Sequence, residues 1–516
     1  MRDPRRYRKT APTRNNMSEN TAFSKLFQDP DFREALTSVL LPGYLPKQRW
    51  FTSKGKHIEN CRIAGVYPIQ DDGGVVLVEV SFSDGSREQY QMPLAINARP
   101  EQRALYQENH PRLILGEITG TGMLVDAVAR EDFRSRLYTL IREGETLEHG
   151  LCAEAGKAVR EGAASATSVV PAIDTSNTAI VYNDTFFFKL FRKLDPGLNP
   201  DLELVRFLSE HTDFAYCPPY GGCLGVGRME EEGYLNLGLM SGKVDNHGDA
   251  WELFQQLTER YFSGTEQTVD TETLARARLL GVRTAEMHKA LASAGPDRPD
   301  LVPEPMTAEY RTEITEAALR LLERQFAQLA EKLSSLPPAT QVLARRVLGV
   351  HQQLNDRLGR LREREMEAQL TRIHGDYHLG QVLYTDTDFY IIDFEGEPLL
   401  SIPERRRKRP PLKDVGGMVR SFHYAAQGQL LLNEERYRGR ELTDRADHWY
   451  QVVSQTYLDA YFEACGHAGF LPREEADRHA LLELFILEKA VYEVAYELNS
   501  RPGWLAIPLK GVLSLV

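Results

Sequence analysis

The sequence contains no long run of apolar residues and few cysteines. No window approaches the about 18 unbroken apolar residues that a membrane-spanning helix needs. The five cysteines are scattered and form no Cys-x-x-Cys pair, which argues against both a disulfide framework and a zinc site. We therefore expect a protein of the reducing cytoplasm that does not cross a membrane.

Positive charge is also scarce, because 62 lysines and arginines face 74 aspartates and glutamates, for a net charge of −12. Such a surface repels nucleic-acid phosphates, so nucleic acid is not expected as a partner. The exception is residues 1–16, a basic segment without the apolar stretch of a secretory signal. We expect residues 1–24 to form a disordered arm; the alternative is an arm that touches an anionic partner.

The composition is that of a folded protein, with 42% hydrophobic and 26% charged residues over 516 positions. This length predicts two or three cooperating lobes rather than one core. Alternating apolar segments and Asp-Gly turns predict a small α+β module over residues 25–150, and a second strand-rich block follows over 151–240. Residues 241–516 have mainly helical patterns.

Three segments predict particular structures. Residues 179–182 and 186–191 flank an Asn-Asp turn and read as a hairpin, followed by a helix that begins at Pro200. Residues 308–370 predict a charged pair of antiparallel helices, broken at 334–338. Residues 382–392 predict a short strand, a turn and a second strand.

The segment His374-Gly375-Asp376-Tyr377-His378-Leu379-Gly380-Gln381 precedes that short hairpin, and Ile392-Asp393-Phe394-Glu395 ends it. Phosphoryl transfer needs one group to orient the attacking hydroxyl and others to hold Mg²⁺ on the phosphates. We assign the first task to Asp376 and the second to Gln381, Asp393 and Glu395, whose oxygens suit a hard cation. The pattern resembles the signature of aminoglycoside-phosphotransferase-like kinases, with Gln381 in place of the usual Asn.

Lys189 stands in the middle of an apolar strand, where an ammonium group without a phosphate or carboxylate partner is costly. We expect Lys189 to bind the phosphates of ATP and Glu203, on the next helix, to pair with it, as in kinases. No glycine-rich loop precedes the hairpin. Residues 174–178 take its place, so Ser176, Asn177 and Thr178 are candidates to cover the phosphates; the alternative is a plain polar turn.

Other residues are expected to hold the catalytic loop and its reacting groups in position. Asp414 resembles the helix aspartate that braces the catalytic loop in this superfamily through backbone hydrogen bonds, and His374 and Arg420 join it. The basic run at residues 405–409 is expected to be a solvated loop, with a phosphate clamp as the alternative.

Three further stretches resemble maltokinase: Lys47-Gln48-Arg49-Trp50-Phe51, the segment at residues 393–398, and the segment at residues 488–502. The resemblance covers roughly residues 25–512. It implies a bilobal α+β fold of the protein-kinase-like, aminoglycoside-phosphotransferase-like type with an N-terminal cap. It also implies transfer of the ATP γ-phosphoryl group to the anomeric hydroxyl of maltose, feeding α-1,4-glucan (glycogen) synthesis. Trehalose synthase, which supplies maltose from trehalose, is a candidate partner.

On the terminal helix, Lys489, Tyr492, Glu493 and Tyr496 recur at helical spacing, so most of them share one face. Aromatic rings and charged tips on such a face suit a sugar, and His378 is a further candidate donor to it. The alternatives are tyrosines that pack into the core and a histidine that braces the loop.

Two other functions fit the same motifs. A kinase for another sugar, such as glucosamine, would share the catalytic signature, which is blind to the acceptor. A non-catalytic pseudokinase that binds nucleotide or trehalose synthase would explain Gln381, although intact Asp376, Asp393 and Lys189 argue against it.

Overall fold

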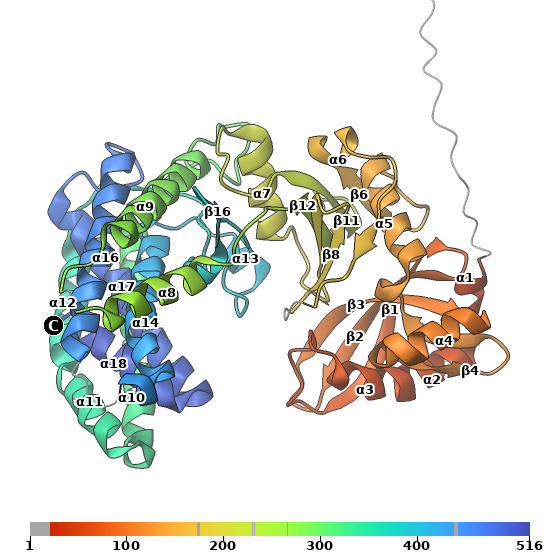
Figure 1. Cartoon of the computed structure of the whole chain (residues 1–516), viewed down its shortest axis with the longest axis horizontal. Coiled ribbons are helices and arrows are strands. Elements are labelled where there is room, and N and C mark those ends of the chain that lie inside the picture. Colours follow the sequence, from red (N-terminus) through yellow and green to blue (C-terminus); the bar gives the residue numbers. More distant parts are fainter. Residues whose placement is uncertain (1–20, 173–175, 230, 232, 266, 438–441) are drawn as a thin grey trace, which may run out of the picture. The chain divides into compact units, whose positions relative to one another are not determined.

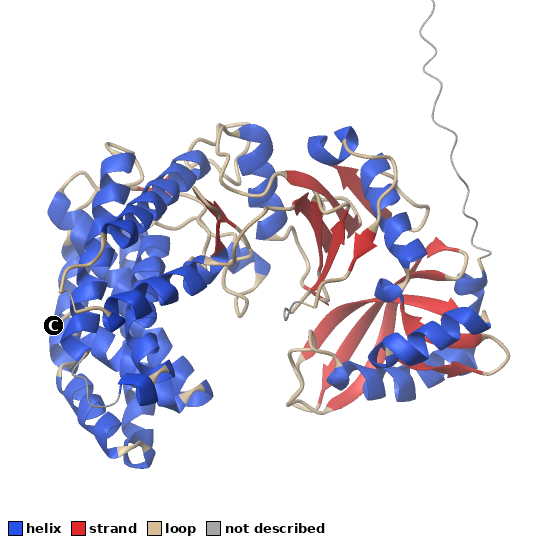
Figure 2. Ribbon diagram, in the orientation of Figure 1, coloured by secondary structure: helices blue, strands red, loops and turns tan. Residues whose placement is uncertain are grey.

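The computed structural model describes residues 21–172, 176–229, 231, 233–265, 267–437 and 442–516. Of the arm predicted at residues 1–24, residues 1–20 lie outside this range. The predicted end of the arm is wrong, because residues 22–24 belong to a helix and the Phe23 side chain is fully buried. By its internal contacts the chain divides into two compact units. Unit 1 comprises Met1–Leu198 and Tyr220–Lys243, and unit 2 comprises Asn199–Pro219 and Val244–Val516. Strands gather in unit 1 and helices in unit 2 (Figure 2).

Unit 1 begins with a cap built on a twisted antiparallel sheet of strand order β1-β2-β3-β5-β4, with β10 added on β3. Strand β2 contains the continuous apolar run Val75–Val78, and nearly every residue of the strand is buried. Short helices cover the sheet with Phe23, Phe27 and Leu36, and the Gln48–Phe51 motif places Trp50 and Phe51 in the same core. The bounds are α1 (Ala22–Leu26), α2 (Pro30–Ala35), α3 (Leu41–Tyr44), β1 (Ile58–Gln70), β2 (Gly73–Phe82), β3 (Arg87–Asn97), α4 (Pro100–Asn109), β4 (Ile114–Ile118), β5 (Gly122–Asp126) and β10 (Lys193–Leu194).

The second sheet of unit 1 has the order β6-β11-β12-β9-β8-β7. The predicted hairpin is confirmed: β8 pairs with β9, and Asn183 and Asp184 both have positive φ, the conformation of a tight type I′ turn. Helix α5 contacts strands of both sheets, so it joins the cap to the second sheet. The bounds are α5 (Glu131–Glu143), β6 (Leu151–Ala155), α6 (Lys157–Glu161), β7 (Ser168–Val169), β8 (Thr178–Tyr182), β9 (Phe186–Leu190), β11 (Tyr220–Val226) and β12 (Leu235–Gly242).

Unit 2 is mainly helical (Figure 1). Helix α7 begins at Pro200, as predicted, and the Asn199 side chain caps it by accepting from the Asp201 backbone N–H. Helix α14 packs against both α16 and α17, and these three helices supply many of the buried residues of unit 2. The bounds are α7 (Pro200–His211), α8 (Ala250–Ser263), α9 (Thr271–Leu291), α13 (Ile402–Arg405), α14 (Leu412–Leu432), α15 (Glu434–Tyr437), α16 (Thr443–Cys465), α17 (Glu475–Ser500) and α18 (Ala506–Leu513).

The predicted pair of charged helices is instead three helices: α10 (Ala308–Lys332), α11 (Pro338–Gly349) and α12 (His351–Glu363). The second arm is interrupted at Gly349-Val350, where a glycine and a β-branched residue weaken the helix. The short hairpin is confirmed as β15 (Val382–Tyr384) paired with β16 (Phe389–Ile391), and β13 (Glu304–Pro305) pairs with β14 (Gln369–Leu370).

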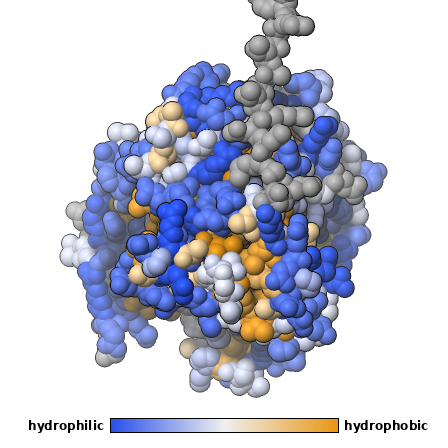
Figure 3. Space-filling model, turned by 90° about the vertical axis from the view of Figure 1, so that its right-hand side faces the viewer, coloured by the Kyte–Doolittle hydropathy of each residue, from blue (hydrophilic) through white to orange (hydrophobic). Residues whose placement is uncertain are grey.

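Across the described residues, no helix is both long and apolar enough to cross a bilayer. The face in Figure 3 is mostly hydrophilic, with one area where apolar residues gather. Mixed sheets and helices with an N-terminal cap confirm the predicted α+β class.

Candidate active site

The loop at residues 374–378 is held in place by hydrogen bonds to one buried carboxylate, that of Asp414 at the start of α14. The backbone N–H groups of His374 and Gly375 donate to Asp414 at 2.8 and 2.9 Å, and His288 Nε2 lies 3.1 Å from the same carboxylate. Burial alone would raise the pKa of Asp414, but the His288 hydrogen bond and the backbone donor lower it below its ordinary value. Asp414 thus stays ionised and makes the backbone contacts that the sequence predicted.

His374 ties this loop to the strand that leads to Asp393. Its Nε2 donates to the Ile392 carbonyl at 2.9 Å, and its Nδ1 faces the Asp376 backbone N–H at 3.4 Å. The ring lies against Tyr377 and Phe394, with centroids 5.3 and 4.9 Å apart. Gly375 has φ +87°, and a Cβ there would lie 3.1 Å from the Gly396 backbone, so glycine is required.

Asp376 lies half-buried beside two cationic or polar side chains. Lys489 Nζ is 3.3 Å from Oδ1 and His378 Nε2 is 3.9 Å from Oδ2. Burial alone would lower the pKa of Lys489, but the nearby Asp376 carboxylate raises it above its ordinary value. The Asp376 carboxyl group therefore lies next to a charged ammonium group.

His378 has the loop-bracing contact that was one of its two predicted roles. Its Nδ1 accepts a hydrogen bond from the Gly380 backbone N–H at 3.1 Å, which places the ring proton on Nε2, facing Asp376. Burial lowers the pKa of His378 below its ordinary value, so the ring is neutral. A neutral Nε2–H can donate to Asp376 or to a bound acceptor.

Three carboxylates of unit 2 offer oxygens within 4.8 Å of one another: Asp201, Asp393 and Glu395. Such a set fits a hard divalent cation such as Mg²⁺. Asp393 has φ +66°, a conformation that non-glycine residues rarely adopt and that is typical of functional sites. Asp201, on α7, was not predicted as part of this cluster. The Phe394 backbone N–H donates a hydrogen bond to Asp201 at 2.9 Å, and these two residues are far apart in the sequence.

Gln381 reaches the same cluster through its amide nitrogen, which donates to Asp393 Oδ2 at 3.0 Å. In this orientation the side chain positions the Asp393 carboxylate. Direct coordination of a cation by Gln381 would need the opposite amide orientation. The predicted ligand role of Gln381 therefore stays a prediction.

In unit 1, Lys189 lies half-buried on β9 between Ala179 of β8 and Leu239 of β12, with Nζ 5.6 Å from the Phe191 ring centroid. Of the predicted phosphate-covering residues, Ser176 is exposed and Asp174 and Thr175 lie outside the described residues. Asn177 and Thr178 both accept hydrogen bonds from Arg192, which also belongs to unit 1, at 3.3 and 2.8 Å.

Arg192 is an unpredicted link between the cap and this strand. It is almost fully buried, pairs with Asp126 of the cap at 2.9 Å, and stacks its guanidinium 4.8 Å from the Trp50 ring centroid. An arginine between Phe191 and Lys193 gives no sequence signal for such a role. The maltokinase-like motif at residues 47–51 thus contributes to the contact that holds residues 177 and 178.

Glu203 has partners that the sequence did not indicate. Its carboxylate accepts from Arg372 and, at 2.7 and 3.2 Å, from Arg406. Two guanidinium groups therefore already compensate the charge of Glu203 within unit 2. Pairing of Glu203 with Lys189 of unit 1 stays a prediction.

The basic run at residues 405–409 is not the solvated loop that we expected. Arg406 also contacts Asp300, Arg407 pairs with Glu313 at 2.8 Å, and the largely buried Lys408 pairs with Glu304. The run is compensated by acidic side chains from distant segments, and nothing in these contacts indicates a phosphate clamp.

A cavity of about 70 Å³ opens beside Asp376. Its volume is room for roughly two water molecules, which suits one hydroxyl-bearing edge of a sugar. Lys489 and Tyr492 of α17 line it as predicted, and Lys489 Nζ lies 5.5 Å from the Tyr492 ring centroid. The further polar lining residues are Glu397, Lys413 and Glu488.

The other two residues of the predicted sugar face lie elsewhere. Glu493 is buried and accepts from Arg420 at 2.7 and 2.9 Å, so its place at the sugar is wrong: the next position after Tyr492 is turned about 100° round the helix. Tyr496 shares the Lys489 face but is 48% exposed, does not line the cavity, and lies against Arg501. Arg420 pairs with Glu493 of α17 and with His423, and its predicted role beside Asp414 at the catalytic loop stays a prediction.

Comparisons with known proteins agree with this arrangement. Residues 44–129 match the model of the maltokinase N-terminal cap domain, and residues 172–449, more than half of the chain, match that of the phosphotransferase enzyme family.

The chain is 27% identical over 265 residues to a glucosamine kinase of Streptacidiphilus jiangxiensis, covering 50% of this chain and 53% of that protein. It is 29% identical over 138 residues to a glucosamine kinase of Mycolicibacterium smegmatis, covering 26% and 32%. The matches thus span about half the length of these relatives or less.

Among solved structures, the chain resembles a glucosamine kinase in complex with glucosamine, ADP and inorganic phosphate, with a TM-score of 0.64 and 19% identity over 92% of this chain and 98% of that one. A second crystal form of glucosamine kinase matches equally well. At this identity the likeness establishes the fold.

Proposed function

Because the chain belongs to the phosphotransferase enzyme family and carries a maltokinase-type cap, we propose that it transfers the γ-phosphoryl group of ATP to the anomeric hydroxyl of maltose. The products are maltose 1-phosphate and ADP. The observation that carries the choice of maltose is the cap, since residues 44–129 match a domain described for maltokinase.

The geometry around Asp376 suits the first task of the reaction. Asp376 orients the attacking hydroxyl and accepts its proton, and Lys489, with Nζ 3.3 Å from Oδ1, holds the carboxylate beside the cavity. Near-attack positioning of this kind supplies much of the rate enhancement in phosphoryl transfer. Neutral His378 is placed to donate to the same carboxylate or to the sugar.

Asp393, Asp201 and Glu395 would hold Mg²⁺, with Gln381 orienting Asp393. The bound cation supplies charge compensation to the ATP phosphates. Lys189 and Ser176 are proposed to bind the phosphates from unit 1, with Arg192 positioning residues 177 and 178.

A glucosamine kinase is the second candidate, because the curated relatives and the solved neighbours bear that name. An ammonium-bearing acceptor would favour free carboxylates at the cavity. Glu488 is paired with Lys413 at 2.9 Å, whereas Asp376 and Glu397 also line the cavity, so the choice of maltose over an amino sugar rests on the cap. Trehalose synthase stays a predicted partner.

The test measures ADP release by the full chain with Mg²⁺–ATP and maltose, glucose, glucosamine or trehalose. We expect maltose to have the highest kcat/KM and trehalose, which has no free anomeric hydroxyl, to be inert. Phosphorus NMR should then show an anomeric phosphate. Glucosamine with the higher kcat/KM would overturn the choice of acceptor, and no ADP release with any sugar would favour the pseudokinase alternative.

A further inference from the structure

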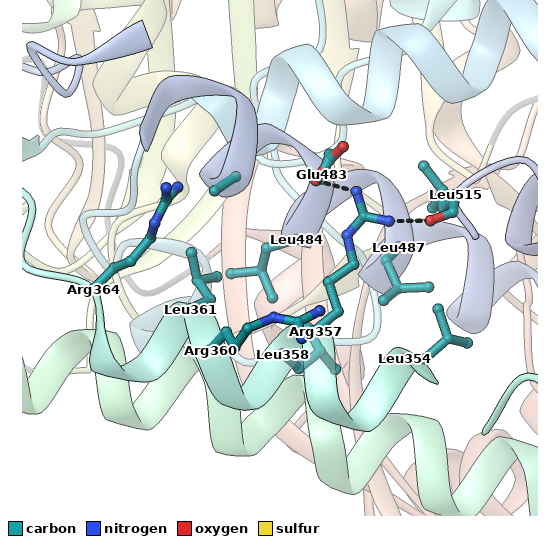
Figure 4. Close-up of a pocket in the computed structure, with 11 residues that line it drawn as sticks. Leu354, Arg357, Leu358, Arg360, Leu361, Arg364, Glu483, Leu484, Leu487 and Leu515 are labelled. Atoms are coloured by element: carbon teal, nitrogen blue, oxygen red, sulfur yellow. Dashed lines mark hydrogen bonds and ion pairs between the residues drawn. The ribbon is translucent and has the colours of Figure 1, made fainter. Parts of the chain in front are cut away.

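A second cavity in unit 2 lies away from Asp376, between α12 and α17 (Figure 4). It measures about 340 Å³, within the size range of small-molecule sites. None of its lining residues lines the cavity at Asp376. We call it the α12–α17 recess; it is lined by Leu354, Arg357, Leu358, Arg360, Leu361, Arg364, Ala480, Glu483, Leu484, Leu487 and Leu515.

The floor of the recess is aliphatic. Leu354, Leu358 and Leu361 follow one face of α12, and Leu484 and Leu487 face them from α17 (Figure 4). These side chains extend over about 10 Å along α12. The recess is open to solvent, and Leu354, Leu358, Leu361, Leu484 and Leu487 are each at most 7% exposed, so a narrow apolar strip faces the recess and favours an apolar occupant. The lining contains no aromatic ring on which a sugar could stack.

The polar groups of the recess are mainly cationic. Arg357 pairs with Glu483 at 2.6 Å and donates to the Leu515 carbonyl, and Arg364 contacts Asp477 at 3.3 Å. Within the part of the chain that the structure describes, Arg360 has no hydrogen bond or ion pair. It extends from α12 toward Arg357 (Figure 4), and Arg357 already pairs with Glu483, the carboxylate of the lining. One positive charge is left for an anion, in a chain whose net charge is −12.

We propose that the α12–α17 recess binds a small amphiphilic anion: a medium-length aliphatic chain on the leucines, with a carboxylate or phosphate head on Arg360 and Arg357. The aliphatic floor supplies affinity through burial, and the arginine pair selects the charged head group. This site is independent of the sugar that the protein phosphorylates.

Calorimetry on the full chain tests the proposal with octanoate and octyl phosphate, both below the concentrations at which they aggregate, and with uncharged octanol. We expect saturable binding of at least one anion and binding of octanol at least about tenfold weaker, as for loss of a charge-assisted contact. Tighter binding of octanoate would identify the carboxylate as the head group, and tighter binding of octyl phosphate the phosphate. Octanol binding as tightly as both anions would overturn the proposal, as would no saturable binding of either.

Two variants with a matched control localise the site. Arg360→Glu should weaken anion binding about tenfold or more, whereas Arg362→Glu, the same charge change at an exposed α12 position outside the lining, should leave it within about twofold. Ala480→Phe, which fills the recess from α17, should abolish binding while the unchanged far-ultraviolet circular dichroism shows that the protein is folded. Wild-type affinity in both Arg360→Glu and Ala480→Phe, or equal losses in Arg360→Glu and Arg362→Glu, would show that the anion binds elsewhere.

Discussion

Two ion pairs lie four residues apart on α17 and differ in almost every property. Lys489 contacts Asp376 at 3.3 Å, with 33% and 23% of the two side chains exposed. Glu493 contacts Arg420 at 2.7 Å, with 11% and 1% exposed. The sequence spacing alone assigned Lys489 and Glu493 to the same sugar face.

Burial separates the roles of the two pairs. A half-exposed pair contributes little to folding and can be broken by an incoming hydroxyl. A buried pair is expensive to break, since the partner left behind is an uncompensated charge in the interior. We therefore expect the first pair to control turnover and the second to control stability.

The largest effect is expected from Asp376→Asn. This change removes the proton acceptor and leaves the shape of the side chain, so kcat should fall by about 10²–10⁴-fold. The affinity for Mg²⁺–ATP, measured by calorimetry, should stay within about threefold, because Asp376 is proposed to contact the acceptor. A variant with near-normal kcat would contradict the assignment of the base.

Glu493→Gln should act on folding. It leaves the Arg420 guanidinium buried beside a neutral amide, and the free energy of unfolding should fall by about 3–5 kcal/mol. The sugar KM of the folded fraction should change by less than about threefold. Urea unfolding measures the loss, and the double variant Arg420→Met/Glu493→Leu should recover part of it. A large change in sugar KM with unchanged stability would return Glu493 to the sugar site.

Local sequence patterns predicted the parts of the site that are close along the chain. The hairpin at residues 382–391 brings Gln381 within 3.0 Å of Asp393, as expected from strand, turn and strand. The Asp414 contacts to the loop also follow from a motif. Each of these inferences needed only local geometry or a familiar spacing.

Contacts between distant segments could not be predicted in this way. The arginine partners of Glu203, the acidic partners of residues 406–408 and the position of Asp201 beside Asp393 all join segments more than 90 residues apart. The charge pattern of the sequence indicates which charged side chains need a partner of opposite charge. It does not identify which of the many carboxylates is that partner. The prediction for Glu493 was wrong for a related reason: it lies only about 40° round the helix from Lys489, and its partner Arg420 comes from a different helix, α14.

Lys489→Met should have a smaller effect than either change above. It removes the ammonium group beside Asp376 and keeps an unbranched side chain, so kcat/KM for the sugar should fall about tenfold. Unfolding free energy should change by less than about 1 kcal/mol, as for other partly exposed pairs. A stability loss as large as that of Glu493→Gln would show that the two pairs do not differ in the way that their exposure indicates.

The smallest effects are expected for two tyrosines of α17, Tyr492 and Tyr496, which can be compared directly because they lie one turn apart on the same helix. Tyr492 lines the cavity at Asp376, whereas Tyr496, one turn further along, is 48% exposed and lies against Arg501. Tyr492→Ala should raise the sugar KM about fivefold to tenfold with little change in the ATP KM, because an aromatic contact to the acceptor contributes about 1 kcal/mol or more. Tyr496→Ala is the matched control on the same helix and should leave both KM values within about twofold. Steady-state kinetics with sugar and ATP varied in turn measure all four values. Equal increases in the sugar KM for the two variants would mean that the acceptor extends along α17 beyond the cavity, and the sugar face predicted from spacing would then include Tyr496 after all.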